Sequence, residues 1–244
     1  MMARSGRRRR TWRLVAAGVV VVLAAIAALV SAFPSVAATT CPRCFGLVAL
    51  RDGLYAERGL SDDERERLIE LDADANRLVG DFYEGRKSTP SVLACFSAGC
   101  YARIGGGGER GVAVLNRAVM LSPRGIDPVI AAHELSHVEF HERLGARSKQ
   151  VPQWFDEGLA VLVSDDSRYL LANTAGDRCR AVSDEELPSS LDAWLKAATA
   201  DQQVYAKAAC RVSRWVDSHG GHRAILDLID RLNQGEPFAT ALTG

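Results

Sequence analysis

The sequence has little that would suit a nucleic-acid-binding protein. Only 7% of its 244 residues are aromatic, no ribonucleoprotein-like aromatic motif occurs, and no basic stripe runs along the chain. The formal net charge is zero, but six of the 30 basic residues are arginines within the first 13 positions. The remaining 24 basic residues face 30 acidic ones, so this larger part carries about six net negative charges. Nucleic acid is therefore not an expected partner.

Internal repeats and long low-complexity stretches are also absent from the sequence. The one homopolymeric tract is the glycine run at 105–108. A chain of 244 residues is long enough for one ordinary domain with a sizeable core and a short accessory segment.

An uncharged run of 19 residues, 14–32, follows the N-terminal arginines. As a helix it would span roughly 28 Å, close to the ~30 Å hydrocarbon thickness of a bilayer. Arginines before the run and none directly after it predict a cytoplasmic N-terminus. We therefore expect residues 1–13 to be a basic cytoplasmic segment that touches anionic lipid, and 14–32 to be a transmembrane signal anchor. The rest of the chain would be extracytoplasmic, either periplasmic or extracellular.

A cleaved signal peptide is the alternative interpretation of the same segment. Small residues around Ala37 and Ala38 offer a site for a signal peptidase, and cleavage there would give a secreted protein. The apolar run is longer than the roughly 7–15 residues usual in signal peptides, which favours the anchor.

The six cysteines are an even number, as suits a compartment that permits disulfides. We expect neighbours in sequence to pair, although six cysteines allow about 15 connectivities. The expected pairs are Cys41 with Cys44, Cys95 with Cys100, and Cys179 with Cys210. The CPRC segment at 41–44 could alternatively bind zinc, but no second CxxC completes such a site.

The order of strand and helix patterns predicts an α+β fold, with a small β-sheet followed by a mostly helical C-terminal half. Residues 33–60 are expected to be a linker or entry segment, and 61–244 the main domain, which contains the motifs described below. A helix is expected over 61–85, because Ser61 and Glu64 form a capping-box pattern. Strand composition occurs at 90–96 and, as one longer candidate, at 111–123.

Prolines mark the start of the next two expected helices. Pro128 opens a helix that stops near Gly145, and Pro152 opens another. The C-terminal third has helical patterns at 184–198, 200–218 and 221–234, and the segment SHGGH at 218–222 breaks the last two apart.

The segment HELSHVEFH, residues 133–141, lies within the first of these helices. On a helix, His133 and His137 lie about 40° apart around the axis and ~6 Å apart along it, so both imidazoles can bind one zinc ion. Glu134 follows the first histidine and can act as general base toward a water that the zinc makes acidic. The spacing therefore predicts a hydrolytic zinc site, which needs a third ligand.

Two residues are candidates for that ligand. On a regular helix His141 would lie ~12 Å along the axis from His133, and no glycine between His137 and His141 turns the chain, so we do not expect His141 to bind the metal. Glu157 follows Trp154 and Phe155 in the next expected helix, which can lie antiparallel to the first. Two histidines and one glutamate with an open fourth position are typical of catalytic zinc and not of a closed structural site.

The motifs HELSH and WFDEGLA together resemble those of the gluzincin metallopeptidases, the thermolysin-like and aminopeptidase-N-like group. The chain is most similar to the minimal domains called peptidase-MA-like, over roughly residues 87–244. The resemblance implies that His133, His137 and Glu157 bind one zinc ion per chain and that Glu134 is the catalytic base. It also implies a thermolysin-like fold in which an edge strand near 111–123 pairs with extended substrate.

The sequence departs from the family in two places. The spacing between His137 and Glu157 is one residue longer than is usual in aminopeptidase-N-like enzymes, so the connecting loop differs. The glycine-rich exopeptidase motif of those enzymes is absent, so aminopeptidase activity is not expected.

The leading hypothesis is a membrane-tethered or exported zinc peptidase that acts on peptides or proteins. The alternative is a catalytically silent peptidase-like module for binding or assembly in the cell envelope. Peptide hydrolysis needs a donor to the oxyanion besides the metal. Tyr205, His219 and His222 are candidates for this donor, and the sequence leaves the choice among them open.

Overall fold

The computed structural model describes residues 4–174 and 176–243. Its β-sheet has five strands in the order β1-β2-β3-β5-β4. The central strands β2, β3 and β5 run parallel, whereas β1 is antiparallel to β2 and β4 is antiparallel to β5. The strands are β1 (Leu47–Arg51), β2 (Leu54–Glu57), β3 (Ser91–Ala94), β4 (Gly111–Val114) and β5 (Ala118–Leu121).

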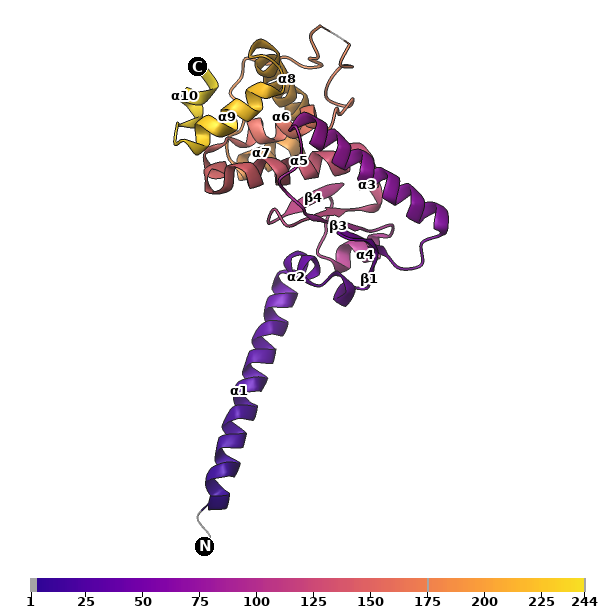
Figure 1. Cartoon of the computed structure of the whole chain (residues 1–244), viewed down its shortest axis with the longest axis vertical. Helices are drawn as coiled ribbons and strands as arrows, with labels where there is room; N and C mark the ends of the chain where they lie inside the picture. The colour runs from indigo at the N-terminus through magenta and orange to yellow at the C-terminus, as the bar shows by residue number, and fades with distance from the viewer. Residues whose placement is uncertain (1–3, 175, 244) are drawn as a thin grey trace.

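Helices cover both faces of this sheet (Figure 1). The helices α3 (Asp62–Phe82) and α5 (Pro128–Leu144) pack on one face, where Val92 and Leu121 lie in the main core. The short helices α2 (Pro34–Thr40) and α4 (Ala98–Arg103) pack on the other face with Leu93 and Met120. Neighbouring strand residues thus enter different cores, as the two-residue period of a strand requires.

The expected helix at 61–85 is confirmed as α3, and so is its capping box. The Ser61 hydroxyl accepts a hydrogen bond from the Glu64 backbone N–H, and the Glu64 carboxylate accepts one from the Ser61 N–H at 2.8 Å. This reciprocal pair satisfies two backbone donors that a helix leaves free at its start.

The expected single strand at 111–123 is wrong, because the chain reverses within it. Leu115 and Asn116 have φ angles of 50° and 54°, and the Arg117 N–H donates to the Val114 carbonyl at 2.9 Å. This is the backbone of a tight hairpin turn, which joins β4 to β5. Leucine is an unusual residue for a positive φ, so its presence gave no signal of the turn.

The segment 33–60, expected to be a linker, contributes two strands to the sheet. The 3₁₀-helix η1 (Pro42–Phe45) follows α2, and β1 and β2 then form a hairpin. Asp52 and Gly53 lie between these strands, and Asp-Gly is a strong hairpin signal that the sequence analysis missed. The sheet therefore begins upstream of residue 61.

The C-terminal half is helical, as expected. Its elements are η2 (Pro123–Gly125), α5, η3 (Gly145–Gln150), α6 (Gln153–Val163), α7 (Leu191–Ala200), α8 (Gln203–Ser218), α9 (Arg223–Asn233) and α10 (Phe238–Thr243). The break between α8 and α9 is confirmed, with Gly220 and Gly221 at positive φ. The helix expected from residue 184 begins only at Leu191, because Ser190 caps it.

All three expected disulfides are present. The bond between Cys41 and Cys44 lies at η1, so these two thiols are not available as zinc ligands. The second bond joins the end of β3 to α4. The third joins Cys179, in the segment between α6 and α7, to Cys210 on α8.

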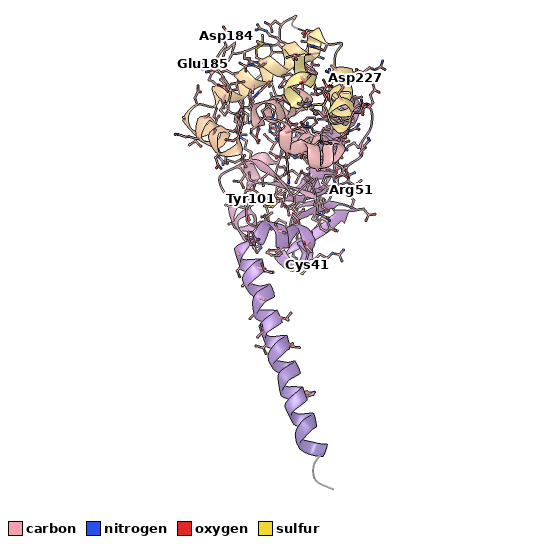
Figure 2. The ribbon with its side chains drawn as sticks, turned by 90° about the vertical axis from the view of Figure 1, so that its left-hand side faces the viewer. Cys41, Arg51, Tyr101, Asp184, Glu185 and Asp227 are labelled. Atoms are coloured by element: carbon pink, nitrogen blue, oxygen red, sulfur yellow. A yellow bond between two sulfur atoms is a disulfide. The ribbon has the colours of Figure 1, made fainter. Side chains whose placement is uncertain are left out.

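The helix α1 (Arg4–Ala32) extends away from the rest of the chain (Figure 1). Figure 2 shows Cys41 at the end of the folded part nearest to α1, with Asp184 and Asp227 toward the opposite end. Within residues 4–174 and 176–243, no single helix is long and apolar enough to cross a membrane. Gly18–Ala32 and α2, bent by 107°, could do so as a pair by length and composition alone. The anchor at 14–32 stays a prediction.

Candidate metal centre

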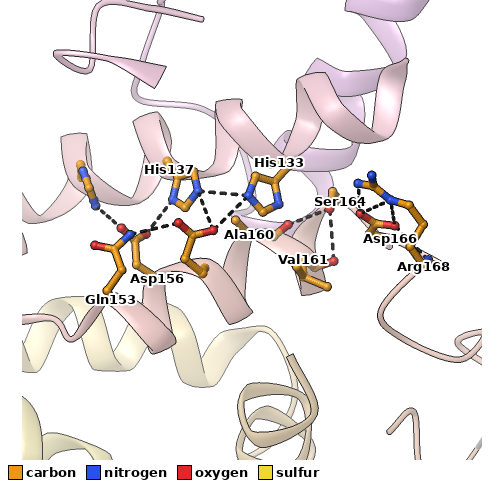
Figure 3. A network of polar contacts seen from close by, with 11 residues as sticks. His133, His137, Gln153, Asp156, Ala160, Val161, Ser164, Asp166 and Arg168 are labelled. Carbon is orange, nitrogen blue, oxygen red and sulfur yellow. Dashed lines mark hydrogen bonds and ion pairs between the residues drawn. The ribbon is translucent and has the colours of Figure 1, made fainter. Parts of the chain in front are cut away.

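Helix α5 presents both histidines of the HELSH motif to one point. Pro128 occupies its first turn, and the Asp127 side chain accepts a hydrogen bond from the Val129 N–H at 2.8 Å, so the helix starts sharply. It continues without interruption to Leu144. The Nε2 atoms of His133 and His137 lie 3.2 Å apart, and Figure 3 shows the two rings side by side.

Helix α6 packs against α5 and brings Glu157 to the same point. The Glu157 Oε2 atom lies 3.4 Å from His133 Nε2 and 3.8 Å from His137 Nε2. The next residue, Gly158, lets α6 approach α8 closely, because a Cβ there would lie 2.7 Å from the Ala208 carbonyl oxygen. A glycine at this position is therefore needed for the close packing of α6 on α8.

The three side chains fit a single metal ion. Two ligand atoms at 2.0–2.1 Å from a tetrahedral zinc ion would lie about 3.3 Å apart. The observed separations of 3.2, 3.4 and 3.8 Å are close to this value. Only 12–13% of each side chain is exposed, so the donors lie at the bottom of the site. His133, His137 and Glu157 therefore form a group that can hold a metal ion.

Asp156 supports this group, and the sequence analysis missed it. Its Oδ1 lies 2.9 Å from His137 Nδ1 (Figure 3). Its Oδ2 lies 2.7 Å from His141 Nε2. When Nδ1 of His137 carries a proton, it can donate a hydrogen bond to Asp156. Nε2, which faces His133 and Glu157, is then the nitrogen that can bind a metal ion. The only signal in the sequence was the position of Asp156 directly before Glu157.

His141 does not join the three donors, in agreement with the sequence analysis. It contacts the far oxygen of Asp156 instead, and 28% of its side chain is exposed. His141 therefore orients the aspartate that orients His137.

Glu157 has a second contact that fixes which oxygen faces the histidines. Gln153, one turn earlier on α6, donates its side-chain N–H to Glu157 Oε1 at 3.1 Å. This leaves Oε2 toward His133 and His137. Sequence reasoning did not identify Gln153.

The charges around the site favour deprotonated carboxylates. Burial acts to lower the pKa of His137, but attraction to Asp156, the hydrogen bond with it, and attraction to Glu157 and Glu134 raise that pKa to about 10. Burial acts to raise the pKa of Asp156, but attraction to His137 and hydrogen bonds with His137 and His141 lower it well below the usual range. Burial also acts to raise the pKa of Glu157, but a hydrogen bond with His133 and attraction to both histidines leave this pKa lowered. Asp156 and Glu157 are therefore anions, and a metal ion that binds here displaces a proton from His137.

Glu134 lies beside this group at the wall of a cleft of about 500 Å³. Strand β4 touches it closely, because a Cβ on Gly111 would lie 2.8 Å from Glu134 Cγ. Burial raises the pKa of Glu134, and the Glu157 carboxylate adds to the rise against the attraction of the two histidines. A carboxyl group with a raised pKa suits proton transfer near neutral pH.

Only one of the three candidate oxyanion donors lines this cleft. Tyr205 lies on its wall with His133 and Glu134, and its ring stacks on Tyr169 at 5.1 Å between centroids. His219 stacks on Trp215 at 4.6 Å, and His222 contacts Glu84 at 3.1 Å. Both of these histidines line other pockets. Of the three candidates, Tyr205 is therefore the one that the geometry supports as the oxyanion donor.

Comparisons with known proteins give no relative. No family model matches the chain, and no curated protein and no solved structure matches it significantly. The fold and the site together define an α+β chain with a candidate His-His-Glu metal centre at the bottom of a cleft.

Proposed function

We propose that the protein is a zinc-dependent peptidase of the gluzincin type with a thermolysin-like domain. The observation that carries this proposal is the approach of His133 Nε2, His137 Nε2 and Glu157 Oε2 to within 3.8 Å of one another, with Glu134 beside them. Two histidines and one glutamate are the donor set of catalytic zinc, and one of the three, His133, lines the cleft together with Glu134. A zinc ion bound there supplies a Lewis acid and makes water a better nucleophile at neutral pH.

The side chains around the donors have distinct roles in the proposed reaction. Glu134 takes a proton from the attacking water and transfers it toward the leaving amine. Tyr205 donates a hydrogen bond to the oxyanion that forms on the attacked carbonyl. Burial and the nearby Glu157 charge raise the pKa of Tyr205, so its hydroxyl stays protonated and remains a donor at neutral pH.

Strand β4 suits the binding of an extended polypeptide. It is the last strand of the sheet, and Gly111 at its start lines the cleft beside Glu134. An edge strand offers unpaired backbone groups along one side, and a peptide in extended conformation can pair with them. The substrate is therefore proposed to be a peptide or an unfolded segment of a protein.

The substitution Glu134→Gln tests the proposed reaction. It keeps the shape of the side chain but removes the base, so hydrolysis of an unfolded protein should fall by about 10²–10⁴-fold while one zinc per chain remains. Glu142→Gln is the matched control, because Glu142 is exposed on the same helix. If zinc-loaded wild type hydrolyses nothing across a broad peptide library, the peptidase proposal fails and the silent binding module replaces it.

We also propose that residues 14–32 anchor the protein in a membrane, with the folded part extracytoplasmic. Three disulfides support an oxidising compartment. Ala38 is fully buried within α2, so cleavage near it would cut a helix that belongs to the folded part. The full chain should stay with membranes after an alkaline wash and be digested by protease added outside. A chain that is released, with an N-terminus near Ala38, would contradict the anchor.

A further inference from the structure

The cleft above the metal centre has a basic rim. Three arginines line it together with His133, Glu134 and Tyr205, whereas the lining contains a single further carboxylate, that of Glu109. The arginines are Arg110, Arg124 and Arg168. The chain beyond residue 13 carries net negative charge, so this concentration of positive charge differs from the molecule around it.

Among the described residues, one of the three arginines is in an ion pair. Arg168 is paired with the buried Asp166, with its Nε 2.8 Å from Oδ1. Arg110 and Arg124 form no ion pair within residues 4–174 and 176–243. Both side chains are exposed. They are therefore free to bind an anion in the cleft.

The one acidic residue of the rim is already engaged. Glu109 Oε1 accepts hydrogen bonds from the Tyr101 hydroxyl at 2.8 Å and from the Gly107 N–H at 2.8 Å. These contacts hold the carboxylate within its own loop. Burial opposes ionisation of Glu109, but these bonds and the attraction of Arg124 leave its pKa lowered, so it is an anion. The lining as a whole holds three arginines and two glutamates, Glu109 and Glu134.

Arg110 and Arg124 are held together at the start of β4. The Ser122 N–H donates to the Arg110 carbonyl at 2.9 Å, and Arg110 Nη1 donates to the Arg124 carbonyl at 3.5 Å. Arg124 also donates to the Gly108 carbonyl. Arg110 directly precedes Gly111, whose Cα lies against Glu134. Arg110 is thus next to the backbone that touches the proposed base, and its hydrogen bond to the Arg124 carbonyl links Arg124 to it.

We infer that Arg110 and Arg124 bind a carboxylate of the substrate, so that the cleft selects polypeptides with an acidic group close to the scissile bond. This inference rests on the proposed peptidase function and names the class of its substrate. A guanidinium group matches a carboxylate with two parallel hydrogen bonds, which gives orientation as well as attraction. The carboxylate comes either from an acidic side chain within the polypeptide or from its free C-terminus.

The experiment compares peptides that differ in one carboxylate. Two amidated peptides carry Glu or Gln next to the cleaved bond, and a third carries Gln with a free C-terminal carboxylate. For the zinc-loaded full chain in detergent, kcat/KM should favour one of the carboxylate peptides by about ten- to a hundredfold over the neutral peptide. Preference for the Glu peptide identifies a side-chain carboxylate, and preference for the free acid identifies the C-terminus.

Variants assign the preference to the arginines. The double substitution Arg110→Gln with Arg124→Gln should reduce the preference to less than about threefold, with little change for the neutral peptide. Arg117→Gln is the matched control, because Arg117 is exposed in the turn at the other end of the same hairpin. It should leave the preference intact. Zinc content should be the same in all of these proteins.

A binding measurement separates this inference from the proposed reaction. Dissociation constants of the same peptides for zinc-loaded Glu134→Gln do not depend on turnover. A carboxylate preference in binding, with no hydrolysis by wild type, would support the inference and overturn the peptidase proposal. Equal binding and equal cleavage of all three peptides would overturn the inference and leave hydrolysis standing. A preference that survives the double substitution also overturns it.

Discussion

Helix α5 carries a buried charged cluster on each of two sides, and the two clusters differ in how they are closed. Around Glu139, hydrogen bonds from the protein itself satisfy the carboxylate. Around Asp156, the carboxylate binds two histidines, and one of them, His137, has its remaining nitrogen facing His133 and Glu157. Both clusters begin from the same helix within two turns of each other.

The cluster at Glu139 is closed. Its side chain has no exposed surface and accepts hydrogen bonds from the Lys87 N–H, from the N–H and hydroxyl of Ser88, and from Arg143 Nε, at 2.6–2.9 Å. Arg143 also donates to the carbonyls of Tyr83 and Gly85. These bonds attach the connection between α3 and β3 to helix α5. Every contact of Glu139 is therefore structural.

The cluster at Asp156 is open toward the cleft. Asp156 holds His137 through Nδ1, while Nε2 of His137, Nε2 of His133 and Oε2 of Glu157 face one another. Without a metal ion, a protonated His137 and a hydrogen bond between His133 and Glu157 hold these atoms together, and a metal ion that binds here replaces protons. The difference teaches that buried charge alone does not identify a functional site. A better indication is a group of possible metal ligands that lies beside a cleft.

The largest effect should come from breaking the closed cluster. Glu139→Ala removes the acceptor of the Ser88 hydroxyl and of Arg143 Nε and the ion-pair partner of Arg86, so the free energy of unfolding should fall by about 3–5 kcal/mol. The molecules that remain folded should keep one zinc per chain. Chemical unfolding and elemental analysis on the same sample check both parts. Loss of zinc with unchanged stability would reverse the roles assigned to the two clusters.

A change in the open cluster should affect metal more than folding. Asp156→Asn removes the charge that orients His137, so zinc affinity should fall by about ten- to a hundredfold. Competition with a chelator measures this affinity, and Glu142→Gln on the exposed side of the same helix should leave it unchanged. Unaltered affinity would mean that His137 needs no help from Asp156.

The closed cluster should also appear in the pH dependence of stability. Burial opposes ionisation of Glu139, but hydrogen bonds from Ser88, Lys87 and Arg143 leave its pKa lowered. A lowered folded-state pKa stabilises the protein above the ordinary glutamate pKa of about 4.3, and this contribution is lost as the pH falls through the folded-state value. Below about pH 4.3 the wild type should lose stability more steeply than Glu139→Gln. Parallel curves for the two proteins would contradict this assignment.

The smallest effect should come from His141, at the exposed end of the open cluster. His141→Ala removes one partner of Asp156 but leaves its bond to His137, so zinc affinity should change by less than about fivefold. Loss of one zinc per chain in this variant would instead make His141 part of the donor group.

The sequence predicted most of the candidate site. His133 and His137 lie one turn apart on a helix whose start is marked by Pro128, and helical geometry alone brings them together. Glu157 was predicted because two successive helices joined by a short connection tend to pack antiparallel. The disulfides were also predicted by pairing successive cysteines. Nearness in the chain accounts for the pairs 41–44 and 95–100, whereas Cys179 and Cys210 are 31 residues apart and meet through tertiary packing.

Other parts depended on contacts that no local pattern encodes. Asp156 and Glu157 are neighbours in sequence, and only the packing of α6 against α5 and α8 decides which oxygen meets which histidine. The hairpin between β4 and β5 was missed because Leu115 adopts a conformation that its residue type disfavours. In the sequence, nothing distinguishes Glu139 from an exposed acidic residue on a helix, although its side chain is buried in the structure.

The sequence by itself determined the elements whose causes are local: helix starts set by caps and prolines, the spacing of two histidines, and the pairing of nearby cysteines. Tertiary structure alone decided the support of the donors by Asp156 and Gln153, the selection of Tyr205 over His219 and His222, and the basic rim of the cleft. Residues 110, 124, 133, 134 and 205 meet at one cleft from separate parts of the chain. Such contacts depend on how helices and strands pack, and short-range sequence patterns specify the elements but not their packing.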